Sequence, residues 1–154
     1  VFFVLRKGNG TPDVHVATYR DRSTSPFNLA YKLKPLGVWY NNAQIAIEYA
    51  GGGGTTADVL FNTLGYGNCY KRKNTTDHSR TSVAGGYHWQ TTGATKPKII
   101  TFFDRWLKDE LLLIRDADLV EEIKVFVKVE GSDVKKEAAK QRALTITMTT
   151  SWPR

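Results

Sequence analysis

The segment AQIAIEYAGGGG, which spans Ala43–Gly54, constrains the fold more than any other part of the chain. Its first seven residues are mostly apolar with two isoleucines, a pattern that predicts a short buried strand. The strand ends in an acid, Glu48, and a four-glycine loop follows it. Proteins built from alternating strands and helices place their sites at this carboxyl end of a strand. Glu48 is therefore the main candidate site residue.

A carboxylate at the end of a buried strand is costly unless it is paired or binds a cation. Glu48 therefore has two interpretations, a ligand for a metal ion or the acid of a salt bridge with a lysine. The residues around it favour neither one. The glycine run that follows is no phosphate-binding loop, because it lacks the lysine that such a loop requires.

The rest of the chain predicts one mixed α/β domain over residues 1–154. Ser25 and Pro26 are typical of a helix start, and Pro35 predicts a kink or a late break in that helix. Thr55 or Thr56 is expected to cap the next helix. The predicted order starts with a hairpin of strands 2–5 and 14–19, a helix at 26–40, the strand at 43–49, a helix closed by Gly65 and a strand at 68–73. A long loop or flexible hairpin at 74–95 follows, and then a helix at 96–108, a strand at 111–114, a helix at 117–127 and a tail.

The chain is basic, with 22 lysines and arginines against 15 acids and a net charge of +7. Such a charge favours a polyanionic partner such as nucleic acid. Lys71, Arg72 and Lys73 follow Tyr70 and form a basic, partly aromatic edge that suits a phosphate backbone, although protective lysines on an edge strand give the same pattern. Lys96 begins a helix and could hold a phosphate, or the helix could simply be capped by Thr95.

Several classes of protein and site are excluded. The single cysteine, Cys69, forms no internal disulfide, and the sequence has no zinc-ligand spacing. No apolar run is long enough for a membrane span, so no membrane partner is expected, and the first residues do not have the pattern of a signal peptide.

Two long strings together resemble the nuclease domain of the large subunit of phage terminases. They are HVATYRDRSTSPFNLAYKLKPLGVWYNNAQIAIEYAGGGGTTADVLFNTLGYGNCYKRKN and GGYHWQTTGATKPKIITFFDRWLKDELLLIRDADLVEEIKVFV, which cover the chain from about His15 to Val127. The resemblance implies an RNase H-like mixed sheet flanked by helices. It implies cleavage of double-stranded DNA by two ions, Mg²⁺ or Mn²⁺, held by carboxylates on adjacent strands and on a later element. It also implies the terminase ATPase domain, the small terminase subunit and the portal as partners, in the cytoplasm of an infected bacterium.

The sequence departs from the family pattern at both ends. Glu48 matches the middle acid of the family, but the strand with the first acid is expected before Val1, and the tail at 132–154 is atypical and lacks the last acid. We therefore predict impaired cleavage. The alternative function is a non-catalytic DNA-binding or assembly module on the same fold. Without the first strand the sheet should be weak, which predicts a homo-oligomer formed by strand exchange.

Overall fold

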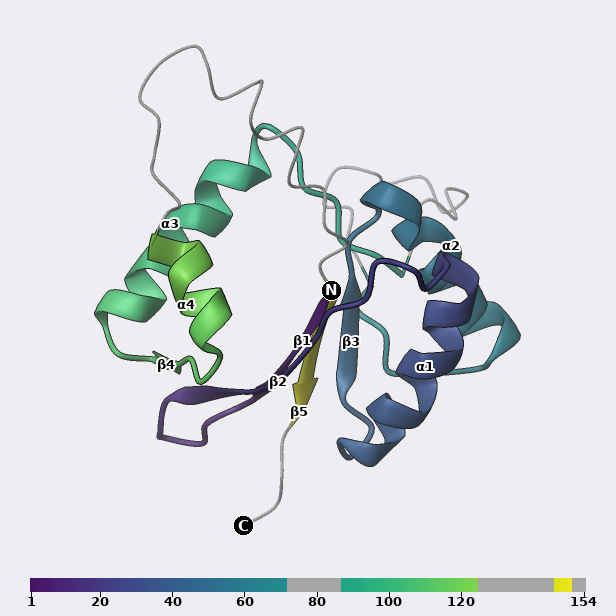
Figure 1. Cartoon of the computed structure of the whole chain (residues 1–154), viewed down its shortest axis with the longest axis horizontal. Coiled ribbons are helices and arrows are strands. Elements are labelled where there is room, and N and C mark those ends of the chain that lie inside the picture. Colours follow the sequence, from purple (N-terminus) through teal and green to yellow (C-terminus); the bar gives the residue numbers. More distant parts are fainter. Residues whose placement is uncertain (72–86, 125–145, 151–154) are drawn as a thin grey trace, which may run out of the picture.

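The computed structural model describes residues 1–71 and 87–124 and the backbone of 146–150. These residues form a mixed five-stranded sheet in the order β3-β5-β1-β2-β4, with helices on either side (Figure 1). The mixed α/β class is therefore confirmed. The elements are β1 (Phe2–Arg6), β2 (Asp13–Tyr19), α1 (Pro26–Trp39), β3 (Gln44–Ile47), the 3₁₀ turn η1 (Ala50–Gly52), α2 (Gly53–Asp58), the π-helical turn η2 (Val59–Thr63), α3 (Thr95–Lys108), β4 (Leu112–Leu113), α4 (Ala117–Lys124) and β5 (Ile146–Thr150).

The strands β1 and β2 form the predicted antiparallel hairpin. Phe2 pairs with Tyr19 and Val4 with Ala17, and the register shifts between Val4 and Leu5. Phe2 and Val4 are buried, so one face of the hairpin belongs to the core.

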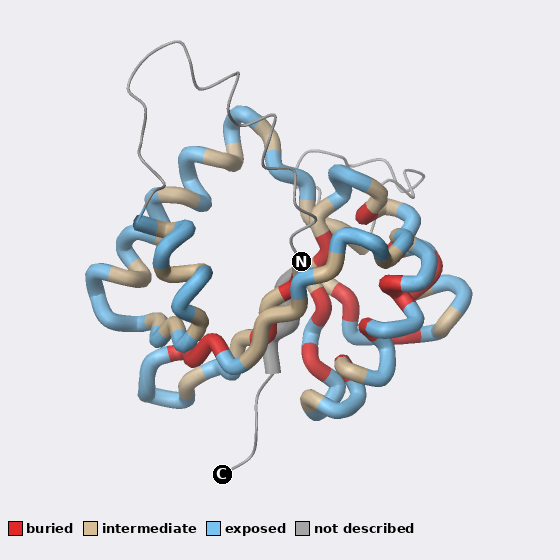
Figure 2. The backbone as a smooth tube through the Cα atoms, viewed as in Figure 1, coloured by how far each residue is buried: buried red, intermediate tan, exposed pale blue. Residues whose placement is uncertain are grey.

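The helix α1 begins as predicted, because the Ser25 side chain accepts a hydrogen bond from the backbone N–H of Asn28. It continues through Pro35 to Trp39, so the predicted late break is wrong. Its buried side packs with α2 and η2 on one face of the sheet, where the buried residues gather (Figure 2). The core consists of Phe2, Val4, Leu29, Ala30, Leu33, Ala43, Ile45, Ile47, Ala57, Val59, Leu60, Tyr66 and Cys69.

The strand β3 lies where the sequence predicts it, but the next helix begins earlier than expected. It starts at Gly53, and the residue before it, Gly52, makes no side-chain cap. Thr55 and Thr56 lie inside the helix, so the predicted threonine cap is wrong. The Thr56 hydroxyl is buried and donates instead to the backbone oxygen of Pro26, which ties α2 to the start of α1.

The tail contributes a strand that the sequence pattern does not indicate. β5 runs between β1 and β3, parallel to β1 and antiparallel to β3. Phe2 pairs with Ile146, and Ile47 pairs with the same residue from the other side. The hairpin and the Glu48 strand are therefore held together by a segment that comes about a hundred residues after the Glu48 strand.

The helices α3 and α4 lie apart from this core. Neither has a buried residue, and both lie on the other side of the sheet from α1 and α2 (Figures 1 and 2). They are joined to the hairpin where Asp13 and Val14 pair with the two residues of β4. The helices at 96–108 and 117–127 are thus confirmed over their described residues; 125–127 lie outside them.

Candidate functional site

Glu48 follows the last residue of β3 and is half-buried. It forms an isolated parallel bridge with Trp89. Ile45 and Ile47 point into the core, and side chains alternate along a strand, so Glu48 lies on the face opposite α1 and α2. We call this the far face. Within the described part of the chain, no lysine or arginine forms an ion pair with the Glu48 carboxylate.

The glycine run allows α2 to pack directly on the end of β3. A Cβ atom at Gly53 would lie 1.6 Å from the backbone oxygen of Glu48, and one at Gly54 would lie 2.7 Å from the Tyr49 ring. Gly52 has a φ of 94°, a conformation that favours glycine. The run therefore serves close packing around Glu48 and Tyr49, in agreement with its lack of a phosphate-binding lysine.

Two short segments extend the sheet beyond β3. Ile45 donates its backbone N–H to Asn68 and accepts one from Tyr70 through its carbonyl oxygen, at 2.9 and 2.8 Å. Trp89 donates to the Ile47 oxygen and accepts from the Tyr49 N–H, at 2.5 and 2.7 Å. The predicted strand at 68–73 is thus reduced to one bridge, between Cys69 and Ile45, within its described residues.

This edge gathers aromatic and basic side chains. The rings of Tyr49 and His88 lie 4.6 Å apart and those of Tyr70 and Trp89 lie 6.0 Å apart, between centroids. The Lys71 ammonium lies 5.4 Å from the centre of the Tyr87 ring. We call these residues the β3-edge cluster; they are Tyr49, Tyr70, Lys71, Tyr87, His88 and Trp89.

The other predicted nucleic-acid contacts are less well defined. Arg72 and Lys73 lie outside the described residues. Lys96 is in the first turn of α3 and is half-buried, and its backbone N–H donates to the Thr92 oxygen. The predicted cap by Thr95 is wrong, because Thr95 lies inside α3, where its hydroxyl accepts from the backbone N–H of Thr92. The Thr92 hydroxyl instead accepts from the backbone N–H of Thr95.

Sequence reasoning missed part of this edge. It placed residues 74–95 in a long loop or flexible hairpin and gave Tyr49 no role, whereas Trp89 pairs with β3 and the Tyr49 ring lies beside that of His88 at a tilt of 39°. The signal was the aromatic run at 87–89, in which three ring-bearing residues follow one another.

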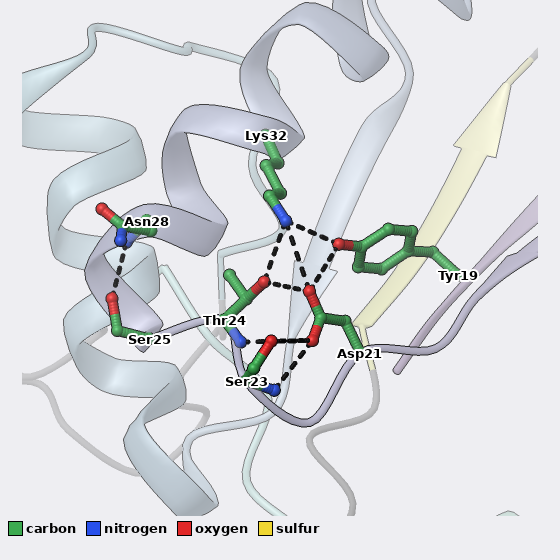
Figure 3. Close-up of polar contacts among 7 residues, drawn as sticks. All are labelled: Tyr19, Asp21, Ser23, Thr24, Ser25, Asn28 and Lys32. Atoms are coloured by element: carbon green, nitrogen blue, oxygen red, sulfur yellow. Dashed lines mark hydrogen bonds and ion pairs between the residues drawn. The ribbon is translucent and has the colours of Figure 1, made fainter.

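The two-ion site implied by the resemblance needs further carboxylates beside Glu48, but three other acids, Asp21, Asp13 and Asp116, form hydrogen bonds or ion pairs elsewhere. Asp21 accepts hydrogen bonds from Thr24, Ser23 and Tyr19 and from the Lys32 ammonium (Figure 3). The bonds from Thr24 and Ser23 hold the pKa of Asp21 well below its ordinary value. This acid fixes the turn that leads from β2 into α1.

Asp13 and Asp116 also form ion pairs and hydrogen bonds away from Glu48. Asp13 is buried and pairs with Lys7 at 2.6 Å. Asp116 accepts from the Thr18 hydroxyl at 2.5 Å and from the Arg20 guanidinium at 2.9 Å. Across the described ranges, no three histidines, cysteines or acids come together in a group that could hold a metal ion.

The strand next to β3 explains in part why no second carboxylate lies beside Glu48 among the described residues. The family pattern puts carboxylates on adjacent strands, but the strand next to β3 is β5, and its sequence ITMTT has no acid. The described residues therefore do not fit two divalent ions, because one half-buried carboxylate supplies too little charge to hold both against water.

Comparison of the sequence with models of known protein families finds no match, and comparison with curated proteins finds none of significant similarity. As for membranes, no helix in the described segments is both long enough and apolar enough to cross one.

Proposed function

We propose that this chain is a DNA-binding domain on an RNase H-like, terminase-type nuclease scaffold in which metal-dependent cleavage is impaired. The observation that carries the proposal is the position of Glu48, at the end of β3 and next to the β3-edge cluster. An acid of nuclease type and a basic, aromatic edge thus share one end of the sheet. The net charge of +7 favours the same polyanionic ligand, which we propose is double-stranded DNA.

The order of elements around Glu48 supports the scaffold. A hairpin, a helix, the Glu48 strand and a glycine turn follow one another as in the resemblance. The proposal includes the partners that the resemblance implies, namely the ATPase domain, the small terminase subunit and the portal, in the cytoplasm of an infected bacterium. It also includes the ions, Mg²⁺ or Mn²⁺, with Glu48 as the residue that would hold one of them.

The test measures binding and cleavage separately. Fluorescence anisotropy with a labelled duplex should show binding that weakens steeply as salt rises. Lys71→Gln should reduce the slope of log affinity against log salt by about 1, while Lys108→Gln, whose ammonium pairs with Asp104 on α3, should leave it unchanged. Supercoiled plasmid in Mg²⁺ or Mn²⁺ should be nicked weakly or not at all.

Two results would contradict the proposal. If the chain shows no salt-dependent binding to the duplex, the proposed DNA binding is wrong. Vigorous nicking that Glu48→Ala abolishes would show that cleavage is intact.

A second candidate function is an assembly module, and the apolar side of α3 favours it. Phe102 is 71% exposed, and it lines a groove of about 570 Å³ with Ile99, Phe103, Trp106 and Leu111. Large exposed apolar patches mark contacts with other proteins. A homo-oligomer by strand exchange belongs to the same candidate, with β5 of a partner copy taking the place between β1 and β3.

A further inference from the structure

We infer that two copies of this chain associate through α3, with the two helices packed antiparallel about a two-fold axis. The inference rests on the second candidate function in one respect, that α3 is a contact with protein, and it commits that contact to a second copy of the chain. It does not depend on DNA binding, because none of its support comes from the Glu48 end of the sheet.

The first support is an apolar stripe along α3 that borders an open groove. Ile99, Phe102 and Trp106 are three and four residues apart, so they lie on one side of the helix. Phe102 is 71% exposed, and all three side chains line the groove. Figure 2 shows no buried residue along α3 or α4. Apolar surface of this kind gains free energy when a second apolar surface removes it from water.

The second support is the distribution of charge along the same helix. Lys96 and Lys98 lie in its first turn, which has no acid, and Glu110 lies just past its last turn. Among the described residues, no ion pair involves Lys96, Lys98 or Glu110. The other charges near the end of α3 pair within the helix region, Lys108 with Asp104 and Arg105 with Asp109. The helix therefore has a basic start and an acidic end whose charges are not yet matched.

The direction of packing follows from this charge and from two-fold symmetry. In a two-fold contact the same surface of both copies is used. Parallel helices would set Lys98 against the partner's Lys98 and Glu110 against the partner's Glu110. Antiparallel helices bring the basic start of each copy to the acidic end of the other, which is the complementary arrangement.

The apolar stripe fits the same arrangement. Ile99 and Trp106 lie three and four residues to either side of Phe102. Antiparallel packing centred at Phe102 therefore sets Ile99 against the partner's Trp106 at both ends of the stripe. Lys98 then comes within about one helical turn, roughly 5.4 Å along the axis, of the partner's Glu110, which is within reach of a lysine side chain.

The test follows the dimer by sedimentation velocity over a range of protein concentrations. Lys98→Glu and Glu110→Lys should each weaken dimerisation about 10-fold, because each sets two pairs of like charges against each other. Both replacements suit the helix dipole, an acid at the start and a base at the end, so neither should weaken α3 itself.

Mixing the two variants gives the decisive result. In a heterodimer of the Lys98→Glu and Glu110→Lys chains, both contacts again join opposite charges. The equimolar mixture should therefore dimerise about as tightly as the native chain. A variant that simply failed to fold could not be rescued in this way. A mixture no tighter than the single variants would refute the antiparallel contact.

The apolar stripe is tested with one further pair of variants. Phe102→Ala should weaken dimerisation at least about 10-fold, since each dimer loses two exposed rings from its centre. The control is Val38→Ala on α1, where Val38 is 54% exposed, and it should leave the dimer unchanged. A native chain that stays monomeric at every concentration, or a dimer that Phe102→Ala leaves intact, would overturn the inference.

The outcomes also separate this inference from the proposed function. If the native chain is monomeric and still binds the duplex in a salt-dependent manner, the α3 contact is refuted and DNA binding stands. If the mixed variants restore the dimer but no duplex binds, the α3 contact stands and the proposed DNA binding is wrong.

Discussion

Asp116 joins the α3–α4 pair to the rest of the molecule, and its replacement should loosen α4 without unfolding the core. Its carboxylate accepts from the Thr18 hydroxyl and the Arg20 guanidinium of the hairpin side, at 2.5 and 2.9 Å. It also accepts from the backbone N–H of Leu119, at 3.1 Å, and so caps the start of α4. Because α3 and α4 have no buried residue, such polar contacts carry much of their attachment.

The size of the effect follows from these contacts. Loss of a helix cap costs about 1 kcal/mol, and loss of a hydrogen bond to a charged group costs about 1.5 kcal/mol or more. The side chain is only 13% exposed, so water replaces these bonds poorly. Asp116→Ala should therefore cost about 2 kcal/mol locally, which corresponds to about 30-fold faster exchange of the α4 amide hydrogens. Asp116→Asn keeps a cap and should cost about 1 kcal/mol.

Hydrogen exchange followed by mass spectrometry measures this opening peptide by peptide. Peptides from α1 and β3 should exchange as in the native chain. The matched control is Asp118→Asn on the same helix. Its carboxylate is 83% exposed and lies 4.0 Å from Arg20, so its loss should cost less than about 0.5 kcal/mol.

The pH dependence gives a second check on Asp116. The hydrogen bond from Thr18, then those from Leu119 and Arg20, hold its pKa below the ordinary value. A depressed carboxyl pKa contributes stability that is complete above the unfolded value of about 3.9 and is lost as pH falls toward the folded value. The difference between the native chain and Asp116→Asn should therefore shrink below about pH 4. Equal exchange in the Asp116 and Asp118 variants at neutral pH would refute this account of the attachment.

Two further predictions concern packing and assembly. Gly53→Ala should destabilise the chain by about 3 kcal/mol in urea denaturation, because the added Cβ atom would lie 1.6 Å from the backbone oxygen of Glu48 and force α2 away from β3. The control is Gly67→Ala, whose Cβ atom meets no atom within 4 Å. Equal denaturation midpoints for the two variants would contradict the close packing of Gly53 on Glu48. If α3 is an assembly surface, light scattering should show an oligomer that Phe102→Asp reduces to the monomer and Val38→Asp, 54% exposed on α1, leaves intact; a strict monomer in the native chain would count against both self-association and strand exchange.

Local signals predicted the elements whose stability is set locally. The hairpin has a glycine-rich turn, α1 has its Ser25 cap, and α3 has an apolar stripe at helical spacing. Pro35 does not end α1, because the helix around it is fixed by buried residues on both sides, Leu33 and Gly37. The cap predicted at Thr55 or Thr56 is wrong because α2 begins earlier, at Gly53. Glycine at this position can pack against the Glu48 carbonyl, so the helix begins there without a capping side chain.

β5 and the β3-edge cluster could not be predicted in this way, because their pairing depends on distant residues. The sequence ITMTT is mostly polar and gains its strand conformation from two neighbours, β1 and β3, that offer backbone hydrogen bonds on both sides. Trp89 similarly joins β3 only because the Ile47 oxygen and the Tyr49 N–H project from its outer edge. No periodic pattern in either segment encodes such a neighbour.

The one-sided burial of the sheet supports the proposal that the far face carries the functional site. α1, α2 and η2 cover the face formed by Phe2, Val4, Ile45 and Ile47, and that face holds the described core. Stability therefore constrains the residues of that side. The opposite side keeps a half-buried carboxylate, Glu48, and the rings of Tyr70 and Trp89, which are not part of the core. Because β5 brings no acid to the strand position beside β3, the residues on this face fit nucleic acid better than they fit two metal ions.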